Sequence, residues 1–265
     1  MPGLVTRTAG DASVTVDLDH GGRLATLTVA GHQLLAHVAD DPIHWGAYVM
    51  APYAGRVRNG RLQAAGRTCQ LPLRMPPHAI HGTVLDRRWR QVGGDAFTTD
   101  LGPDWPWPGT VTQVIRLSPD ALELTVEVRT DGAAGVAFPA SAGWHPWFRR
   151  SLAHGHQARL HLSAATMLRR GPDGLPDGTL LSPPPDGPYD DCFTDLRAPT
   201  RIEWPGALTL TVESDCAYLV VYDERPDAVC VEPQTAPPNA LEPPAFTVTG
   251  DTPLRAWTRW SWSPA

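Results

Sequence analysis

Two segments each place one ionisable side chain at the end of an apolar run, directly before a proline. His145 stands in Ala142-Gly-Trp-His-Pro-Trp-Phe148, and Glu232 stands in Val229-Cys-Val-Glu-Pro-Gln234. Proline fixes φ and removes a backbone donor, so strand pairing should end there and the preceding side chain should be rigidly placed. An imidazole and a carboxyl group, with ordinary pKa values of about 6.5 and 4.3, can exchange protons with a substrate. The two groups would suit general acid–base chemistry, but each also has a structural explanation: His145 as a core histidine satisfied by a carbonyl, and Glu232 as the solvated end of a strand.

Three further segments carry polar side chains among small or proline-rich neighbours. Arg56 stands in a Pro-x-x-x-Arg-Val segment, His81 in a His-Gly pair, and Asp190 in a Tyr-Asp-Asp-Cys-Phe segment. Two of them also have structural explanations, Arg56 as a surface ion-pair partner and His81 as a turn cap. Asp191 competes with Asp190 for any role, and on a strand the two should point to opposite faces.

Signatures of several other chemistries are absent. The chain has no phosphate-binding Gly-x-x-x-x-Gly-Lys loop, no Gly-x-Gly-x-x-Gly motif and no Gly-x-Ser-x-Gly elbow. His78 and His81 are three residues apart, a spacing that does not bring two ligands together on a strand or loop. His154 and His156 are expected in a solvated turn. We therefore expect neither a metal ion nor an organic cofactor. The cysteines are too scattered for a disulfide framework or a zinc site: Cys69, Cys192, Cys216 and Cys230.

The charge balance argues against polyanionic partners. The formal net charge is −6, and all 22 basic residues are arginine, without a dense basic run. Nucleic acid and an anionic membrane are therefore not expected as partners.

No signal peptide and no apolar run long enough to span a membrane are visible, so a cytoplasmic location is expected. A monomer and a homodimer both remain open.

Period-two alternation dominates the chain. Runs such as 12–19, 23–29, 111–117, 122–128, 208–212, 218–222 and 256–262 alternate apolar and polar residues between turn residues. With 24 glycines and 28 prolines in 265 residues, long helices are not expected. The segment from Gly171 to Pro188 is expected to be a long surface loop, since it is rich in Pro, Gly and Asp. We predict a single all-β domain over residues 1–265, built as a large sandwich.

Taken in order, these motifs resemble those of the aldose 1-epimerase (galactose mutarotase) family. The set comprises Pro-x-x-x-Arg-Val, His-Gly, Gly-x-His-Pro-x-Phe, Tyr-Asp-Asp-Cys-Phe and Val-x-Val-Glu-Pro-Gln, spanning residues 52–239. The resemblance implies a large antiparallel β-supersandwich that binds a monosaccharide in a cleft on a sheet surface. It implies interconversion of the α and β anomers of a free hexose, such as galactose or glucose, without metal or cofactor.

The resemblance also implies roles for individual residues. His145 matches the general acid and Glu232 the general base, while Arg56, His81 and Asp190 match positions that hold sugar hydroxyls or the ring oxygen. Two positions depart from the family pattern. Gly55 stands where asparagine often precedes the arginine, and Pro76-Pro77-His78 stands where an Asn-rich approach is common. Both departures bear on which hydroxyls are recognised.

Two alternatives remain open. A hexose-phosphate mutarotase would use the same acid and base together with a phosphate site, and a sugar-binding module without catalysis would need no acid opposite a base. The roles of four tryptophans are also open. Alternation is expected to place Trp144 and Trp147 opposite His145, whereas Trp105 and Trp107 belong either to the cleft rim or to the packing. The candidates for the phosphate site are Arg58, Arg61, Arg74, Arg87 and Arg88.

Overall fold

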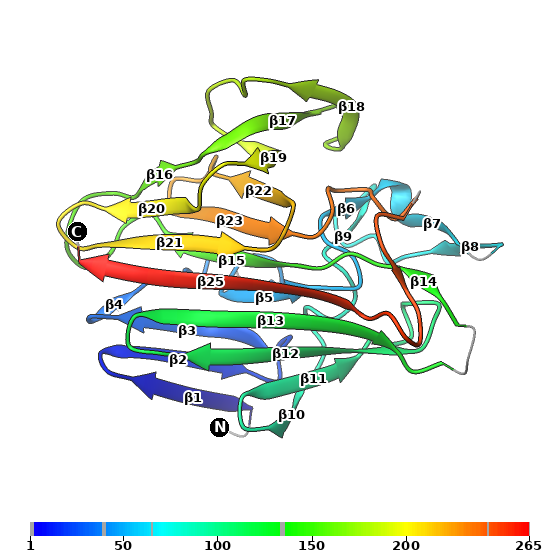
Figure 1. The fold of residues 1–265 in the computed structure, drawn as a ribbon, viewed down its shortest axis with the longest axis horizontal. Helices are drawn as coiled ribbons and strands as arrows, with labels where there is room; N and C mark the ends of the chain where they lie inside the picture. Colours follow the sequence, from blue (N-terminus) through cyan, green and yellow to red (C-terminus); the bar gives the residue numbers. More distant parts are fainter. Residues whose placement is uncertain (1–2, 39–40, 65, 133–135, 243, 265) are drawn as a thin grey trace.

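The computed structural model describes residues 3–38, 41–64, 66–132, 136–242 and 244–264. It confirms an all-β antiparallel fold, and the only helical turn in these ranges is the 3-10 turn Arg58–Gly60. Two large sheets form two layers, seen one behind the other in Figure 1. None of the described segments contains a helix with the length and apolar character of a membrane span.

The larger sheet has eleven strands and carries most of the residues discussed below. Its order is β1-β2-β3-β5-β15-β23-β22-β19-β17-β18, with β4 paired to β3. The strands are β1 (Leu4–Ala9), β2 (Ala12–Asp17), β3 (Arg23–Val29), β4 (His32–Gln33), β5 (Ala47–Met50), β15 (Gly143–Arg149), β17 (Ala164–Arg170), β18 (Pro176–Leu181), β19 (Asp190–Leu196), β22 (Tyr218–Tyr222) and β23 (Ala228–Gln234).

The second sheet has eight strands in the order β10-β11-β12-β13-β25-β21-β20-β16. Three two-stranded sheets, β6–β9, β7–β8 and β14–β24, gather at one end of the sandwich, at the right of Figure 1. The eight strands are β10 (Arg90–Gly93), β11 (Ala96–Asp100), β12 (Gly109–Leu117), β13 (Ala121–Thr130), β16 (Arg159–His161), β20 (Thr200–Trp204), β21 (Leu208–Ser214) and β25 (Leu254–Pro264). The small ones are β6 (Arg56–Val57), β7 (Arg61–Ala64), β8 (Arg67–Gln70), β9 (Ala79–Ile80), β14 (Phe138–Pro139) and β24 (Thr247–Val248).

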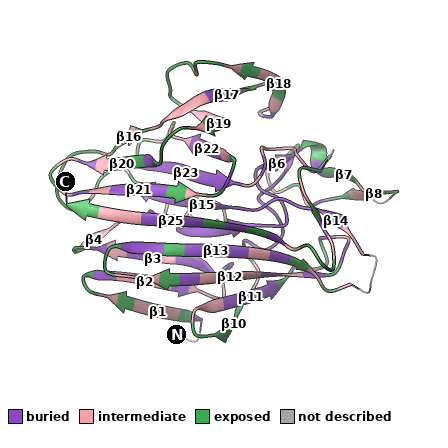
Figure 2. Ribbon diagram, viewed as in Figure 1, coloured by how far each residue is buried: buried purple, intermediate pink, exposed green. Residues whose placement is uncertain are grey.

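The seven alternating runs all form strands, because one face of each is buried between the sheets. β12 and β25 alternate buried with more exposed residues along most of their length, as the purple bands of Figure 2 show. The segment predicted as a loop is an exception, since Gly171–Pro188 contains β18, which pairs with β17. Leu180 and Leu181 pair with Leu168 and Met167 of β17, and the Pro and Gly content of the segment gives no sign of this pairing.

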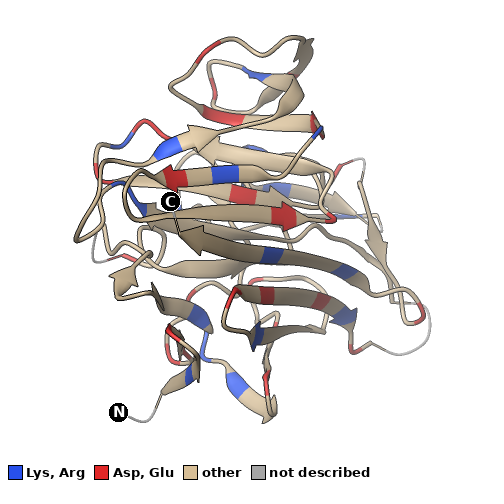
Figure 3. Cartoon of the chain, turned by 60° about the vertical axis from the view of Figure 1, so that its left-hand side comes forward, with Lys and Arg blue, Asp and Glu red and all other residues tan. Residues whose placement is uncertain are grey.

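The core between the sheets is continuous and draws on both of them. Trp144 of β15 points into it and donates a hydrogen bond from Nε1 to Oε1 of Gln113 on β12, at 3.1 Å. Trp105 and Trp107 also lie in this core, packed near Phe138, so they contribute packing and not a cleft rim. Acidic and basic residues are interspersed over the strands and loops in Figure 3.

One charged side chain lies inside the fold. Arg23 is 0% exposed, and its guanidinium donates hydrogen bonds to four backbone carbonyl oxygens, from three separate loops. It also lies over the rings of Trp45 and Tyr48, at 4.1 and 5.0 Å from their centroids. Burial lowers the pKa of Arg23 to about 10, so the group stays charged at neutral pH. The accepting carbonyls belong to His20, Pro42, Trp45 and Leu85.

We expect Arg23→Met to lower the free energy of unfolding by at least about 3 kcal/mol, because it removes four hydrogen bonds from a charged donor to buried or part-buried carbonyl oxygens. Urea denaturation measures the loss. Arg88→Met is the matched control. Its exposed ion pair with Asp19 spans 3.0 Å and should contribute less than about 1 kcal/mol. Equal effects of the two substitutions would contradict a structural role for Arg23.

Candidate functional site

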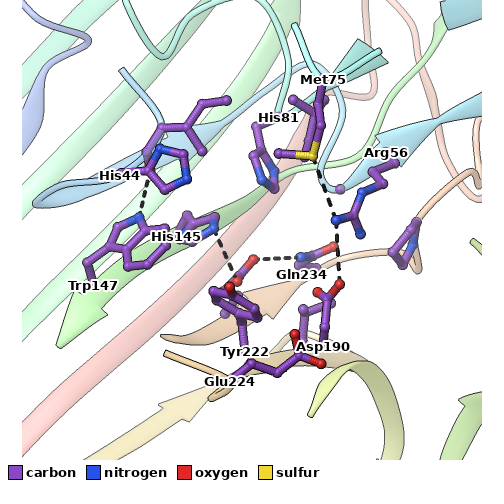
Figure 4. A pocket seen from close by; sticks show the side chains of 16 residues that line it. His44, Arg56, Met75, His81, His145, Trp147, Asp190, Tyr222, Glu224 and Gln234 are labelled. Carbon is purple, nitrogen blue, oxygen red and sulfur yellow. Dashed lines mark hydrogen bonds and ion pairs between the residues drawn. The ribbon is translucent and has the colours of Figure 1, made fainter. Parts of the chain in front are cut away.

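A cavity of about 180 Å³ opens on the face of the eleven-stranded sheet that is turned away from the second sheet. Its floor comes from four adjacent strands, β15, β23, β22 and β19, and its walls come from β6, the end of β9 and the loop before β5. All five residues singled out in the sequence line it: Arg56, His81, His145, Asp190 and Glu232. Figure 4 shows Arg56, His81, His145 and Asp190 converging from these different elements.

The register between β15 and β23 brings the acid–base candidates together. Gly143 pairs with Gln234 and Trp147 with Cys230, so His145 stands across from Glu232. Nε2 of His145 lies 3.3 Å from Oε1 of Glu232, and both side chains are buried. The second carboxyl oxygen of Glu232 accepts a hydrogen bond from Nε2 of Gln234, also at 3.3 Å. One face of one strand pair therefore holds an imidazole and a carboxyl group in contact.

The sequence predicts that strand pairing ends at the two prolines, but neither proline ends its strand. Pro146 lies inside β15 and Pro233 inside β23, and both strands run on past them. Between the pairs Gly143–Gln234 and Trp147–Cys230, however, the β15–β23 ladder has no further paired residues. A proline has no N–H to give to a neighbouring strand, so pairing is interrupted locally beside the two functional groups and then resumes.

Aromatic rings hold the His145 imidazole in place. Tyr48, its cross-strand partner on β5, stacks on it with centroids 5.1 Å apart and 25° between the planes. Trp147 stacks on it at 5.1 Å and 16°. The expectation that Trp147 lies opposite His145 was therefore wrong, because residues two apart on a strand share a face. Trp144, one residue away, does lie opposite. The imidazole is oriented by rings as well as by Glu232.

Burial sets the electrostatics of the pair. It raises the pKa of Glu232 well above its usual range, with a further contribution from the negative charge of Asp190. It lowers the pKa of His145 to about 3, and the proximity of His44, Arg23 and Arg56 acts in the same direction. Both shifts favour neutral side chains, so the buried pair favours one exchangeable proton, held on the carboxyl group. The 3.3 Å contact gives that proton a short path to Nε2.

Arg56 and Asp190 form the opposite side of the cavity from Trp147, as Figure 4 shows. Nη2 of Arg56 donates to Oδ2 of Asp190 at 3.5 Å, and Nη1 of Arg170 donates to the same oxygen at 2.7 Å. Arg170 also pairs with Asp191, whose side chain does not reach the main cavity. The two arginines therefore orient the Asp190 carboxylate.

His81 is placed by an uncommon backbone conformation. Its φ is +59°, in the left-handed region that residues with a Cβ seldom adopt, and its side chain is buried. Gly82 follows with φ +80°, and a Cβ there would lie 2.0 Å from the carbonyl oxygen of Ala51. This tight approach turns the chain so that the His81 ring meets the edge of the His145 ring, with centroids 4.8 Å apart. The close approach to Ala51 that Gly82 permits thus positions His81.

Three buried polar atoms at the cavity have no hydrogen-bond partner among the described residues. They are Nδ1 of His81, Nδ1 of His145 and Oε1 of Gln234. Buried polar groups are normally paired, so unpaired ones around one cavity suggest a ligand that supplies several donors and acceptors. Together with the carboxyl groups of Asp190 and Glu232, they suit a small molecule that carries many hydroxyl groups.

Several cavity residues were missed in the sequence. Gln234 shares a face with Glu232 by the period-two rule, and its place in the Glu-Pro-Gln motif was a usable signal. His44, Met75, Tyr222 and Glu224 also line the cavity, but no local pattern marks them.

The departure from the family pattern at Gly55 has a steric reason. Gly55 has φ +66°, and a Cβ there would lie 2.9 Å from Cγ of Pro238. Asparagine would therefore not fit at this position without a shift of the neighbouring chain.

Other candidates from the sequence lie elsewhere. Both ring nitrogens of His78 have backbone partners, the N–H of Asn59 and the carbonyl of Asp173, so the ring is not a free ligand beside His81. None of the five arginines considered for a phosphate lines the cavity. Four of them pair with carboxylates: Arg58 with Asp173, Arg74 with Asp86, Arg87 with Asp100 and Arg88 with Asp19.

One group of side chains has the composition of a metal site. His145, Cys230 and Glu232 offer ligand atoms that lie within 4.8 Å of one another, and all three are buried. Burial and the charge of Glu232 raise the pKa of the Cys230 thiol well above its usual range, which disfavours the thiolate that a metal requires. Two of the three groups are also the proton-transfer pair, so this arrangement is explained without a metal.

The family model described as aldose 1-epimerase matches residues 4–250. A galactose mutarotase-like protein from Clostridium acetobutylicum superimposes with a TM-score of 0.84 at 18% identity, covering 99% of this chain and 95% of that one. Galactose 1-epimerase from Lactobacillus acidophilus gives a TM-score of 0.78 at 17% identity, covering 99% and 94%. The search of curated proteins found no match.

The raised pKa of Glu232 predicts a pH-dependent loss of stability. A carboxyl group whose pKa is higher in the folded state keeps its proton there, so stability falls as pH rises above the unfolded value of about 4.3. We expect Glu232→Gln, which cannot ionise, to raise Tm at pH 8 by a few degrees, at roughly 2–4 °C per kcal/mol. The gain should shrink toward pH 4.

Thermal melts at both pH values measure this difference. Glu213→Gln, at an exposed position on β21, is the control and should leave Tm nearly unchanged. A lower Tm for Glu232→Gln at pH 8 would contradict the prediction, because it would mean that an ionised pair stabilises the fold.

Proposed function

Because the chain belongs to the aldose 1-epimerase family, we propose that it is a mutarotase that interconverts the α and β anomers of a free hexose such as galactose or glucose. The observation that carries the proposal is the buried contact of 3.3 Å between His145 and Glu232 in a cavity with unpaired polar atoms. Mutarotation needs one group that accepts a proton and one that donates a proton, both within reach of the same carbon centre.

The proposed reaction starts at the anomeric hydroxyl. Glu232 removes its proton while protonated His145 delivers a proton to the ring oxygen, so that the C1–O bond of the ring breaks and C1 becomes an aldehyde. Rotation about C1–C2 and closure on the other face, with the two roles exchanged, give the opposite anomer. Arg56, His81 and Asp190 hold the sugar hydroxyls or the ring oxygen.

The pair enters this cycle with one proton. Burial favours that proton on Glu232, so it must move to Nε2 of His145 before ring opening. A sugar hydroxyl beside Glu232 and the ring oxygen beside His145 would supply the hydrogen bonds that support the ionised pair. Ring closure reverses the proton transfers of ring opening, so it requires two neighbouring groups that can each both give and take a proton.

The charges around the cavity favour a free sugar over a sugar phosphate. Asp190, Glu224 and Glu232 bring three carboxyl groups to its lining, while Arg56 already pairs with Asp190. Arg170, behind Asp190, is shared among Asp190, Asp191 and Glu224. A phosphate would therefore meet carboxylates and no unpaired arginine in the described lining. A non-catalytic sugar-binding module is less well supported, because binding alone does not require an imidazole in contact with a carboxyl group.

Polarimetry tests the proposal. Freshly dissolved α-galactose and α-glucose should approach their equilibrium rotation faster with the protein than without it, and the 6-phosphate esters should not be accelerated more than the free sugars. Binding without acceleration would support the binding module. A marked preference for the phosphate esters would support the hexose-phosphate mutarotase.

Glu232→Gln and His145→Asn should each lower kcat by about 100-fold or more, because they keep the shape and remove the proton transfer. The dissociation constant for galactose, from calorimetric titration, should change much less, since both amides still form hydrogen bonds. Wild-type activity should hold across neutral pH and fall at both ends, where the pair carries two protons or none. A variant that equilibrates α-galactose at nearly the wild-type rate would remove that residue from the mechanism.

Asp190→Ala should weaken galactose binding by about 10-fold or more, because a charged hydrogen-bond acceptor in the cavity is lost. Asp191→Ala is the matched control and should be milder, since Asp191 pairs with Arg170 outside the main cavity lining. Titration with galactose compares the two variants. The reverse order would show that Asp191 is the binding residue.

A further inference from the structure

The loop before β5 carries a histidine into the cavity, on the opposite side of His145 from Arg56 and Asp190 (Figure 4). His44 lies beside Trp147, with ring centroids 5.3 Å apart and 50° between the planes. Nδ1 of His44 lies 2.5 Å from Oδ2 of Asp41, and the same carboxylate accepts hydrogen bonds from the backbone N–H groups of Ile43 and His44. Asp41 therefore shapes the turn and orients the ring.

Buried side chains hold this loop by its carbonyl oxygens. Nε1 of Trp147 donates to Ile43 at 2.6 Å, and Arg23 donates to Pro42 at 2.8 Å and to Trp45 at 3.0 Å. The carbonyls on both sides of His44 are thus bound to the core. Three carbonyl oxygens of this loop are therefore bound by buried donors, so the position of His44 is fixed by the fold.

The Asp41 contact also decides which nitrogen faces the cavity as an acceptor. Because the carboxylate accepts the Nδ1 proton, neutral His44 has its lone pair on Nε2. Within the described part of the chain, no hydrogen bond to Nε2 of His44 is present. A hydroxyl group in the cavity could donate to it, while Trp147 beside it offers an apolar face to the carbon atoms of the same molecule.

We propose that His44, oriented by Asp41, is a substrate-binding residue that accepts a hydrogen bond from one sugar hydroxyl and so contributes to the choice of sugar. The inference rests on the proposed sugar substrate but not on catalysis. It gives the cavity polar contacts on both sides of the acid–base pair, with Arg56 and Asp190 on one side and His44 on the other. The substrate class is a hexopyranose with a hydroxyl at the position that His44 reaches.

The test compares His44→Ala and His44→Gln with the wild type. His44→Ala should raise the dissociation constant and KM for galactose about 3- to 10-fold, the effect of one hydrogen bond, with kcat little changed. His44→Gln should restore part of the loss, because its amide oxygen can take the place of Nε2. His20→Ala is the matched control. His20 has the same i, i+3 contact with an aspartate, Nδ1 to Oδ2 of Asp17 at 2.9 Å, but it does not line the cavity.

Deoxygenated sugars identify the contact. Calorimetric titration uses galactose and its 2-, 3-, 4- and 6-deoxy forms. One deoxy sugar should bind the wild type more weakly than galactose does, whereas His44→Ala should bind that deoxy sugar and galactose with the same affinity. A general loss of thermal stability in His44→Ala would not produce this selective pattern. If all the deoxy penalties persist unchanged in His44→Ala, or if its galactose affinity equals that of the wild type, the inference is overturned.

The outcomes separate this inference from the proposed function. Mutarotation by the wild type with no effect of His44→Ala would overturn the inference alone. Sugar binding with the predicted selective pattern but without mutarotation would overturn the proposed function alone. No binding of any of these sugars to the wild type would overturn both. A fall in kcat at unchanged KM would place His44 in proton transfer and would also overturn its assignment as a binding residue.

Discussion

The site depends above all on the register of one strand pair in the middle of the larger sheet. Because β15 and β23 align Gly143 with Gln234, the imidazole of His145 and the carboxyl group of Glu232 meet on the outer face. A shift by one residue would turn every side chain of one strand to the opposite face. Packing in the core therefore fixes the register: Trp144 is buried between the sheets, and His145, the next residue on the strand, faces the cavity.

Burial of this pair is both a source of instability and the origin of its chemistry. A carboxyl group and an imidazole kept from water favour their neutral forms, so at neutral pH the pair holds one exchangeable proton, on the carboxyl group. The surrounding sheet accommodates this arrangement through stacked rings, with Tyr48 and Trp147 both packed on the imidazole. The same rings keep water from the pair, which strengthens hydrogen bonds to any ligand that enters.

The side chains in the walls of the cavity are positioned by different means from those in its floor. The floor residues follow strand alternation, whereas His81 is held by a left-handed backbone conformation and His44 by buried donors to loop carbonyls. Arg23 connects the two parts, because its guanidinium lies over Tyr48 beneath His145 and also holds the loop that presents His44. One buried charge thus links the core, the acid–base pair and the wall.

Alternation and motifs in the sequence were enough to predict the all-β class, seven of the strands and five cavity residues, because alternation reports one buried face and the motifs lie on or beside strands of the sheet. It misjudged Trp147, whose face the period-two rule would have shown, and it missed β18, whose pairing comes from another strand. The tertiary structure alone decided that the five arginines considered for phosphate lie away from the cavity and that His44 lies in it. Local sequence cannot decide such facts, because they depend on which distant carboxylates and carbonyls a side chain meets after the strands have paired.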